Sequence, residues 1–227
     1  MVGMPQPVIF DLYNTLIDGA DEERDRALRE MAALLGVTPA DLLRVYRESW
    51  PERLVGWGVA ETVRIMAGRL GIDATAQQVA TAAELRRSLP RRLFELVSDE
   101  TLAVLDGLRA DGHPLGVLSN ATAESAEAWP SGPLASRFDV VIFSSVVGLA
   151  KPDPAVYRLA AAGLGAVPEE CVFVGDGADG ELPGAAGVGM TVFRTVEFRD
   201  TLSGWSGPVI DMLADLPGVL RELSSVQ

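Results

Sequence analysis

The sequence predicts an α/β fold in which helices cover both faces of a parallel sheet and a separate helical segment follows the first strand. Short apolar runs without polar alternation recur along the 227 residues and are separated by helical patterns, which is typical of strands buried on both faces. The long interval between the first two runs differs, because nearly all of it has helical periodicity. We therefore expect one sheet and one helical insertion.

The strands of the sheet are predicted from six apolar runs. Each run is short and bounded by turn residues, and the last is expected to form only a short edge strand. The predicted strands are 8–10, 115–118, 140–143, 171–174, 191–193 and 208–210. The later strands are connected by helical patterns over 99–109, 154–164 and 182–186.

The helical insertion is expected to span residues 18–92, so that residues 1–17 and 93–227 form the α/β core. Its helices are expected to begin at capping residues and to end at glycines. These boundary signals are Thr38, Thr75 with Gln78, Gly36 and Gly71. An insertion at this place lies at the carboxyl end of the first strand, where ligands bind in open parallel sheets.

The charge balance excludes several classes of partner. Thirty-two acidic residues against 19 basic ones give a net charge of -13, which disfavours binding to nucleic acid and to anionic membranes. An acidic chain that binds an anionic substrate needs a local positive site or a metal ion. No apolar run approaches the roughly 20 residues of a membrane span. The single cysteine, Cys171, is expected to be a buried, reduced thiol in the cytoplasm. We separately expect a monomer or a homodimer.

Polar side chains follow four of the predicted strands. Asp11 comes after the first strand and the pair Ser119 and Asn120 after the second; Lys151 follows the third and Asp176 the fourth. The carboxyl ends of parallel strands share one edge of a sheet, so these side chains are expected to meet there. A single strand followed by Asp is explained by ordinary turn chemistry. Four strands followed in this order by polar or charged side chains predict an active site.

This order of motifs resembles the haloacid dehalogenase superfamily of hydrolases over essentially the whole chain. The resemblance is carried by DLYNT, LSN, KPDP and GDGADGEL at the four strand ends. It implies a Rossmann-like α/β core with an inserted α-helical cap, and a nucleophile at Asp11 that becomes covalently modified. A carboxylate at a strand tip can attack phosphorus or carbon, after which water cleaves the ester.

The resemblance implies roles for the other strand-end residues. Thr15 and Ser119 are expected to hydrogen-bond the nucleophile or the transferred group. Lys151 is expected to neutralise charge between Asp11 and the attacked group. Asn120 is expected at the substrate, although a simple turn role explains it about equally well.

The residue two places after Asp11 bears on the leaving group. Most phosphatases of this superfamily carry an aspartate there as general acid, whereas this chain has Tyr13, as the dehalogenases do. Asn14 follows where the dehalogenases typically have glycine. Arg47 lies at a place comparable to their arginine for halide and carboxylate, and Tyr157 matches another position they use. Tyr13, Asn14 and Arg47 are therefore predicted to contact substrate.

The fourth strand end favours a metal ion. Asp176 is expected to lie beside Asp11, and two carboxylates that close raise a pKa strongly unless a cation intervenes. The dehalogenases have neutral residues there and work without metal. Mg²⁺ is therefore predicted, with Asp11, Asp176 and the backbone carbonyl of Tyr13 as ligands.

The family that this chain resembles often has a second acidic residue four positions after the first, here Asp176, and at that position this chain has Gly180. Either Asp179 or Glu181 is expected to supply the supporting carboxylate for this metal. An acidic residue in the first turn of a helix is also favoured by the helix dipole, which explains Glu181 about equally well.

These observations predict an Mg²⁺-dependent hydrolase of a small phosphorylated metabolite, acting through an aspartyl-phosphate on Asp11. A metal-independent 2-haloacid dehalogenase using Asp11 and Arg47 is the first alternative, and an inactive ligand-binding member of the family is the second. Substrate choice is expected to lie in the cap. There Trp50, Trp57 and Arg53 either line a pocket for a small anion or pack the cap against the core.

Overall fold

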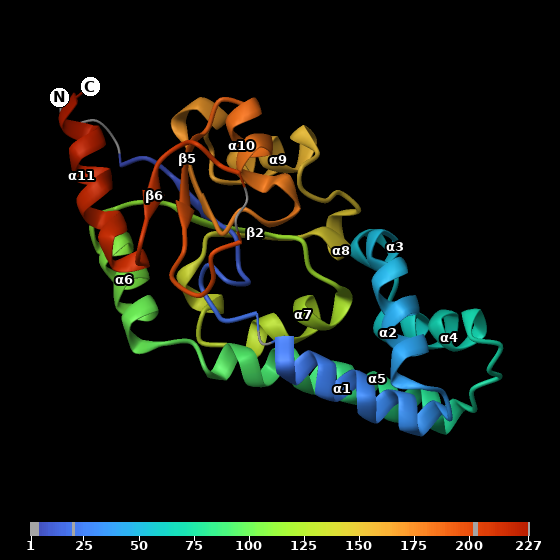
Figure 1. Ribbon diagram of the computed structural model, residues 1–227. Helices are drawn as coiled ribbons and strands as arrows, with labels where there is room; N and C mark the ends of the chain where they lie inside the picture. The colour runs from blue at the N-terminus through green and yellow to red at the C-terminus, as the bar shows by residue number, and fades with distance from the viewer. Residues whose placement is uncertain (1–4, 20, 202–203, 227) are drawn as a thin grey trace.

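The computed structural model describes residues 5–19, 21–201 and 204–226, and its centre is one parallel sheet (Figure 1). Within these residues six strands pair in the order β3-β2-β1-β4-β5-β6, and every pair is parallel. The strands are β1 (Val8–Phe10), β2 (Leu115–Ser119), β3 (Val140–Phe143), β4 (Val172–Gly175), β5 (Thr191–Thr195) and β6 (Val209–Ile210). The predicted α/β fold class is confirmed.

Helices cover both faces of the sheet, so successive residues of a strand are buried on opposite sides. In β1, Val8 and Phe10 pack in one apolar cluster and Ile9 packs in another. Helices α6 (Asp99–Ala110) and α11 (Leu216–Val226) cover the first face; α9 (Pro154–Gly163) and α10 (Glu181–Gly187) cover the second. Two shorter helices, α7 (Ala123–Ala128) and α8 (Ser144–Val147), follow β2 and β3.

The interval between β1 and β2 forms a helical cap with an apolar core of its own. Figure 1 shows these helices beside the sheet rather than over its faces. Thr38 accepts a hydrogen bond from the backbone N–H of Asp41, and Thr75 forms the expected capping box with Gln78. The cap helices are α1 (Asp21–Leu35), α2 (Pro39–Glu48), α3 (Trp50–Val55), α4 (Val59–Arg69) and α5 (Ala76–Glu95).

Helix α5 joins the two parts. Val79 packs in the cap core, whereas Leu93 and Phe94 pack in the cluster of the sheet. The predicted boundary between cap and core at position 92 falls inside this helix, which continues to Glu95. The division into a core of residues 1–17 and 93–227 and a cap of residues 18–92 therefore stays a prediction. Those ranges also include residues 1–4, 20, 202–203 and 227, which lie outside the described residues.

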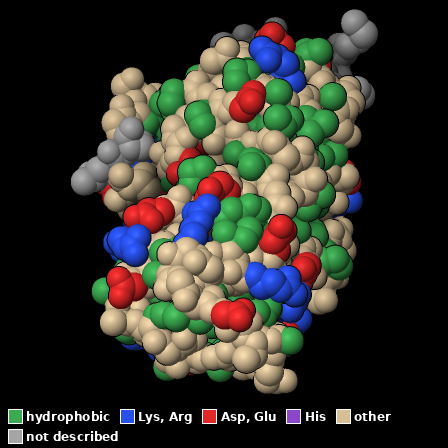
Figure 2. Space-filling model, turned by 90° about the vertical axis from the view of Figure 1, so that its right-hand side faces the viewer, with side chains coloured by type: hydrophobic (Ala, Val, Ile, Leu, Met, Phe, Trp, Pro, Cys, Tyr) green, Lys and Arg blue, Asp and Glu red, His purple; other side chains and the backbone are tan. Residues whose placement is uncertain are grey.

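The surface of the cap side carries acidic and basic side chains interspersed with one another (Figure 2). This view shows no broad basic area that a nucleic-acid backbone would need. Among the described residues, every helix is too short or too polar to cross a bilayer.

Candidate active site

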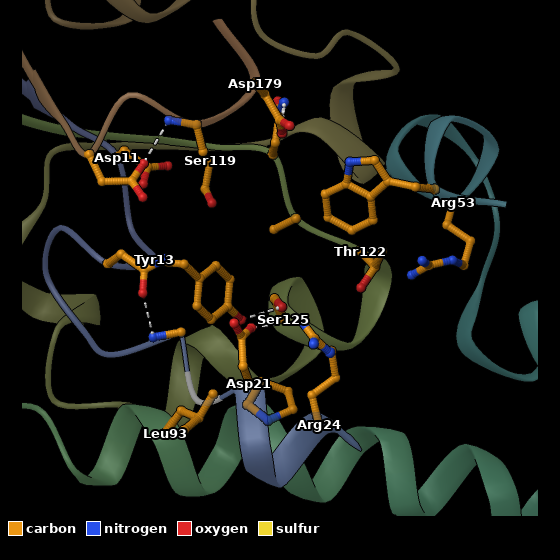
Figure 3. A pocket seen from close by; sticks show the side chains of 18 of the residues that line it. Asp11, Tyr13, Asp21, Arg24, Arg53, Leu93, Ser119, Thr122, Ser125 and Asp179 are labelled. Carbon is orange, nitrogen blue, oxygen red and sulfur yellow. Dashed lines mark hydrogen bonds and ion pairs between the residues drawn. The ribbon is translucent and has the colours of Figure 1, made fainter. Parts of the chain in front are cut away.

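The carboxyl ends of the central strands open into a pocket of about 440 Å³ between core and cap (Figure 3). The strand order places β1 between β2 and β4, so the residues that follow these strands come together. Asp11, Ser119, Lys151 and Asp176 all line the pocket, as predicted from their positions along the chain. The other predicted site residues that line it are Tyr13, Asn14, Arg47, Asn120, Asp179 and Glu181.

Lys151 lies between two carboxylates at the floor of the pocket. Its Nζ is 2.6 Å from Oδ1 of Asp11 and 2.5 Å from Oε2 of Glu181. All three side chains are buried, so their charges are only weakly screened by solvent. Thr15, which is also buried, donates to Oδ2 of Asp11 at 3.3 Å. Both oxygens of Asp11 are thus held in place.

Asp176 brings a third carboxylate to the same point. Carboxylate oxygens of Asp11, Asp176 and Glu181 all lie within 4.8 Å of one another. Oδ1 of Asp176 accepts from the backbone N–H of Ala178 at 2.9 Å, but its buried Oδ2 has no hydrogen-bond partner among the described residues. The nearest cation to this oxygen is the half-exposed Arg199, at 3.9 Å.

The pKa shifts reflect an excess of buried negative charge. Burial raises the pKa of Asp11; Lys151 opposes that shift and the Asp176 carboxylate adds to it. Burial likewise raises the pKa of Glu181 to about 8, although Lys151 opposes the shift. The pKa of Lys151 is also raised, because Asp11 and Glu181 outweigh the effect of its burial. One ammonium group therefore does not balance three carboxylates.

This surplus fits a divalent cation. Asp11, Asp176 and Glu181 offer hard oxygen donors, which Mg²⁺ prefers, and the free Oδ2 of Asp176 is the acceptor that such an ion would satisfy. The structure places Glu181, rather than the exposed Asp179, in this acidic cluster.

Glu181 reaches the cluster because the chain before α10 turns in an unusual way. Asp179 and Gly180 both have positive φ, at 52° and 71°, and α10 then begins at Glu181. The backbone N–H of Gly177 donates to Oε1 of Glu181 at 2.9 Å. A side chain at Gly175 would overlap the Glu181 carboxylate, so glycine is required at the end of β4.

Asn120 holds the main chain of Lys151. Its Nδ2 donates to the Lys151 carbonyl at 2.9 Å, and its Oδ1 accepts from the Lys151 N–H at 2.8 Å. Nδ2 also lies 3.1 Å from Oδ2 of Asp179. Ser119, in contrast, has a buried hydroxyl with no hydrogen-bond partner among the described residues. That hydroxyl is available to a ligand.

Tyr13 forms a wall of the pocket, and its hydroxyl points away from Asp11 (Figure 3). The hydroxyl is 2.7 Å from Oγ of Ser125 on α7, and burial raises its pKa. Asn14 has φ of 58°, and its Oδ1 accepts from the N–H of Gly19 at 3.0 Å, which closes the loop after β1. Both residues therefore have structural contacts besides any contact with substrate.

The cap supplies the other side of the pocket. Arg47 is exposed and lines the pocket together with Trp50 and Arg53, whereas Trp57 is not among the residues that line it. Tyr157 is also absent from the lining: it is buried, and its hydroxyl donates to the backbone carbonyl of Glu181 at 2.9 Å.

Several pocket residues were missed from the sequence. Arg199 follows β5, so the strand-end argument would have found it if extended to the fifth strand. Thr122, Glu124 and Ser125 likewise come within six residues of the end of β2. Asp21, Arg24 and Tyr46 belong to cap helices and carry no such signal.

A family model described as haloacid dehalogenase-like hydrolase matches residues 7–189. The chain belongs to this family. The resemblance predicted from the strand-end motifs is thereby confirmed, and the protein is a haloacid dehalogenase-like hydrolase. Glyceraldehyde 3-phosphate phosphatase of Methanopyrus kandleri is 29% identical to this hydrolase over 232 residues, which covers 97% of this chain and 99% of that protein.

Solved structures of both phosphatases and dehalogenases share the fold of this haloacid dehalogenase-like hydrolase. The HAD phosphatase from Thermococcus onnurineus aligns with a TM-score of 0.70 at 23% identity, covering 95% of this chain and 97% of that one. A 2-haloacid dehalogenase from Pseudomonas syringae pv. Tomato aligns with a TM-score of 0.72 at 23% identity, covering 97% and 100%. The fold therefore does not separate the two reactions.

Proposed function

We propose that this protein is an Mg²⁺-dependent phosphohydrolase of a small, anionic phosphorylated metabolite in the cytoplasm. The observation that carries the proposal is the buried cluster of Asp11, Asp176 and Glu181 around Lys151, with one carboxylate oxygen that has no hydrogen-bond partner in the described part of the chain. Asp11, Asp176 and the backbone carbonyl of Tyr13 would hold the ion, with Glu181 supporting them. When bound, Mg²⁺ supplies charge neutralisation between the nucleophile and the phosphoryl oxygens.

Asp11 is the proposed nucleophile. Thr15 and Lys151 hold its two oxygens, so little reorientation is needed before attack. A carboxylate oxygen forms a bond to phosphorus while the bond from phosphorus to the ester oxygen breaks, and the leaving alkoxide takes a proton from water. Water then attacks the aspartyl-phosphate, which regenerates Asp11 and releases inorganic phosphate.

Lys151 and Ser119 are proposed to bind the transferred phosphoryl group. The ammonium group can follow the charge from the carboxylate to the phosphoryl oxygens, because it already contacts Asp11. The free hydroxyl of Ser119 lies at the neighbouring strand end and can donate to the same oxygens. Asn120 acts on this step by holding the main chain of Lys151 in place.

Tyr13 limits the leaving group. Its hydroxyl points away from Asp11, toward Ser125, and its raised pKa makes it a poor acid. We therefore expect esters with acidic leaving groups, such as acyl phosphates and sugar 1-phosphates, to be hydrolysed faster than esters of simple alcohols.

The test is phosphate release from a panel of small phosphate esters, with Mg²⁺ and with chelator, for the unaltered protein and for Asp11→Asn. We expect release that requires Mg²⁺ and that the Asp11→Asn variant loses. Halide release from a 2-haloacid in the presence of chelator would overturn the phosphatase proposal. That outcome would support the dehalogenase, which Tyr13 and the pocket position of Arg47 favour. No turnover of any substrate would support an inactive binding protein.

A further inference from the structure

Arg53 lies at the side of the pocket opposite Asp11 (Figure 3). It is carried by α3 of the cap, and only 1% of its surface is exposed. Its guanidinium lies 3.9 Å from the ring centroid of Tyr46 and 5.2 Å from that of Trp50. Aromatic faces stabilise the cation, but they do not satisfy its N–H groups.

The hydrogen bonds of Arg53 leave one nitrogen free. Its Nε donates to Oγ of Ser49 at 3.1 Å, and its Nη2 donates to the Tyr46 carbonyl at 2.7 Å. Its Nη1 is buried and has no hydrogen-bond partner among the described residues. An unpaired N–H group of a buried guanidinium is costly, which makes a ligand at this nitrogen favourable.

The charges around Arg53 do not balance. Arg86 of α5 is also buried and pairs with Glu124 of α7, and the charges of both residues act on Arg53. One carboxylate therefore stands against two guanidinium groups. Burial lowers the pKa of Arg53, as expected for a cation without a full counter-charge. One positive charge in this cluster of Arg53, Arg86 and Glu124 is left for another anion.

The other arginines of the pocket do not compete for this role. Arg24 lies 2.7 Å from one oxygen of Asp21, and Arg199 lies 3.1 Å from the other. Arg24 also contacts Asp25. Arg47 is exposed, so solvent screens its charge. Nε of Arg86 also lacks a hydrogen-bond partner among the described residues, but Arg86 does not line the pocket. Arg53 is thus the buried arginine of the pocket lining that has an unused nitrogen.

We propose that Arg53 binds a carboxylate of the substrate, so that the protein selects phosphate esters that carry a carboxylate at the end remote from the phosphoryl group. A single surplus charge and one free nitrogen on Arg53 match a carboxylate better than a second phosphate, which carries more charge and more acceptors. This inference rests on the proposed phosphatase function, because the phosphoryl group is placed at Asp11.

The test uses non-hydrolysable ligands, so that it does not depend on turnover. Phosphonates with one, two or three methylene groups before a terminal carboxylate are each compared with the alkylphosphonate of the same length that ends in a methyl group. Binding to the unaltered protein is measured by titration calorimetry with Mg²⁺ present. We expect the carboxylate to improve Kd at least about 10-fold at the length that spans the pocket, as for a charge-assisted hydrogen bond.

Two variants with opposite effects assign that preference to the cluster. Arg53→Gln keeps a donor for the cap contacts and should abolish the carboxylate preference, while the alkylphosphonate Kd stays within about twofold. Glu124→Gln keeps an acceptor for Arg86 and adds positive charge, so it should increase the preference. The control is Arg44→Gln: Arg44 is an exposed arginine of α2 that contacts Glu48 outside the pocket, so the preference should stay unchanged.

The inference is overturned if the unaltered protein shows no preference for the carboxylate-bearing phosphonates. It is also overturned if Arg53→Gln keeps that preference. If Arg53→Gln does not fold, as judged by its thermal unfolding, an unchanged or smaller preference in Glu124→Gln overturns it instead. Phosphate release by the unaltered protein from phosphoglycolate and ethyl phosphate tests the proposed function separately. If the unaltered protein releases no phosphate from either ester but still binds the carboxylate-bearing phosphonates more tightly, the phosphatase proposal is contradicted and the role of Arg53 is not.

Discussion

Replacing Asp176 with asparagine tests the excess of negative charge directly. Carboxylate oxygens that lie within 4.8 Å of one another repel by about 3 kcal/mol or more at an effective dielectric constant of roughly 20. Lys151 and proton uptake offset part of this repulsion, so we expect Asp176→Asn to stabilise the metal-free protein by about 1–3 kcal/mol. Asparagine keeps an oxygen that can accept from the N–H of Ala178, so the loop before α10 keeps that contact.

The assay is thermal and urea unfolding with chelator and with Mg²⁺. The unaltered protein should gain about 2.7 kcal/mol when Mg²⁺ is present at 100 times its Kd, whereas Asp176→Asn should gain little. An exposed carboxylate outside the site provides the control: Asp73→Asn should change neither the metal-free stability nor the response to Mg²⁺. A less stable Asp176→Asn variant that still responds fully to Mg²⁺ would refute the charge argument and the metal site together.

Three further predictions concern the same pocket. Gly175→Ala should lower the free energy of unfolding by about 1–3 kcal/mol in urea, because its Cβ overlaps Glu181; Gly187→Ala, which meets open space, should not. Burial raises the pKa of Glu181 to about 8, so between about pH 4.5 and 8 this carboxyl group holds a proton more often in the folded metal-free protein than in the unfolded chain. The free energy of unfolding in chelator should therefore fall as the pH rises from about 4.5 to 8. A free energy that does not change with pH in this range would contradict this prediction. Tyr13→Phe loses the hydrogen bond to Ser125, so its free energy of unfolding should fall by about 0.5–1.5 kcal/mol. Its turnover of acyl phosphates should stay within about threefold of the unaltered protein. A turnover reduced 100-fold or more would show that the hydroxyl takes part in the reaction.

The core of the site could be predicted because it depends on strand ends alone. Asp11 and Asp176 follow β1 and β4, and Ser119 is the last residue of the neighbouring β2, so finding the strands was enough to bring these residues together. The bounds of β1 and β3 agree with the apolar runs, while β2 and β5 extend beyond them. Strand ends shift easily because pairing with a neighbour, rather than the apolar run itself, decides where a strand stops.

The acidic loop after β4 shows where spacing fails. A count of positions leads from Asp176 to Gly180, as if the loop had a regular path. The two successive residues with positive φ turn Asp179 outward and place Glu181 at the start of α10, facing Lys151. Such a local backbone path is not visible in the identity of the residues, apart from the glycine.

Contacts between distant parts of the chain could not be predicted. Tyr13 and Ser125 of the core are 112 positions apart, and Arg86 of the cap and Glu124 of the core are 38 apart. No motif pairs these residues with one another, and each contact depends on the tertiary packing. The sequence could therefore suggest that Arg53 faces a pocket, but not that it lies beside a second guanidinium with only one carboxylate between them.

Helix α5 has a mechanical consequence for access to the pocket. Its first half is packed in the cap, with Val79 and Ala83, and its second half is packed under the sheet, with Phe94. A cap that swings away as a rigid body must either bend this helix or pull one half out of its core. Pro90 lies between Ala83 and Phe94 and cannot donate a hydrogen bond to the preceding turn, so the helix is weakest there. If ligand exchange requires such an opening, the turn of α5 at Pro90 must flex with it.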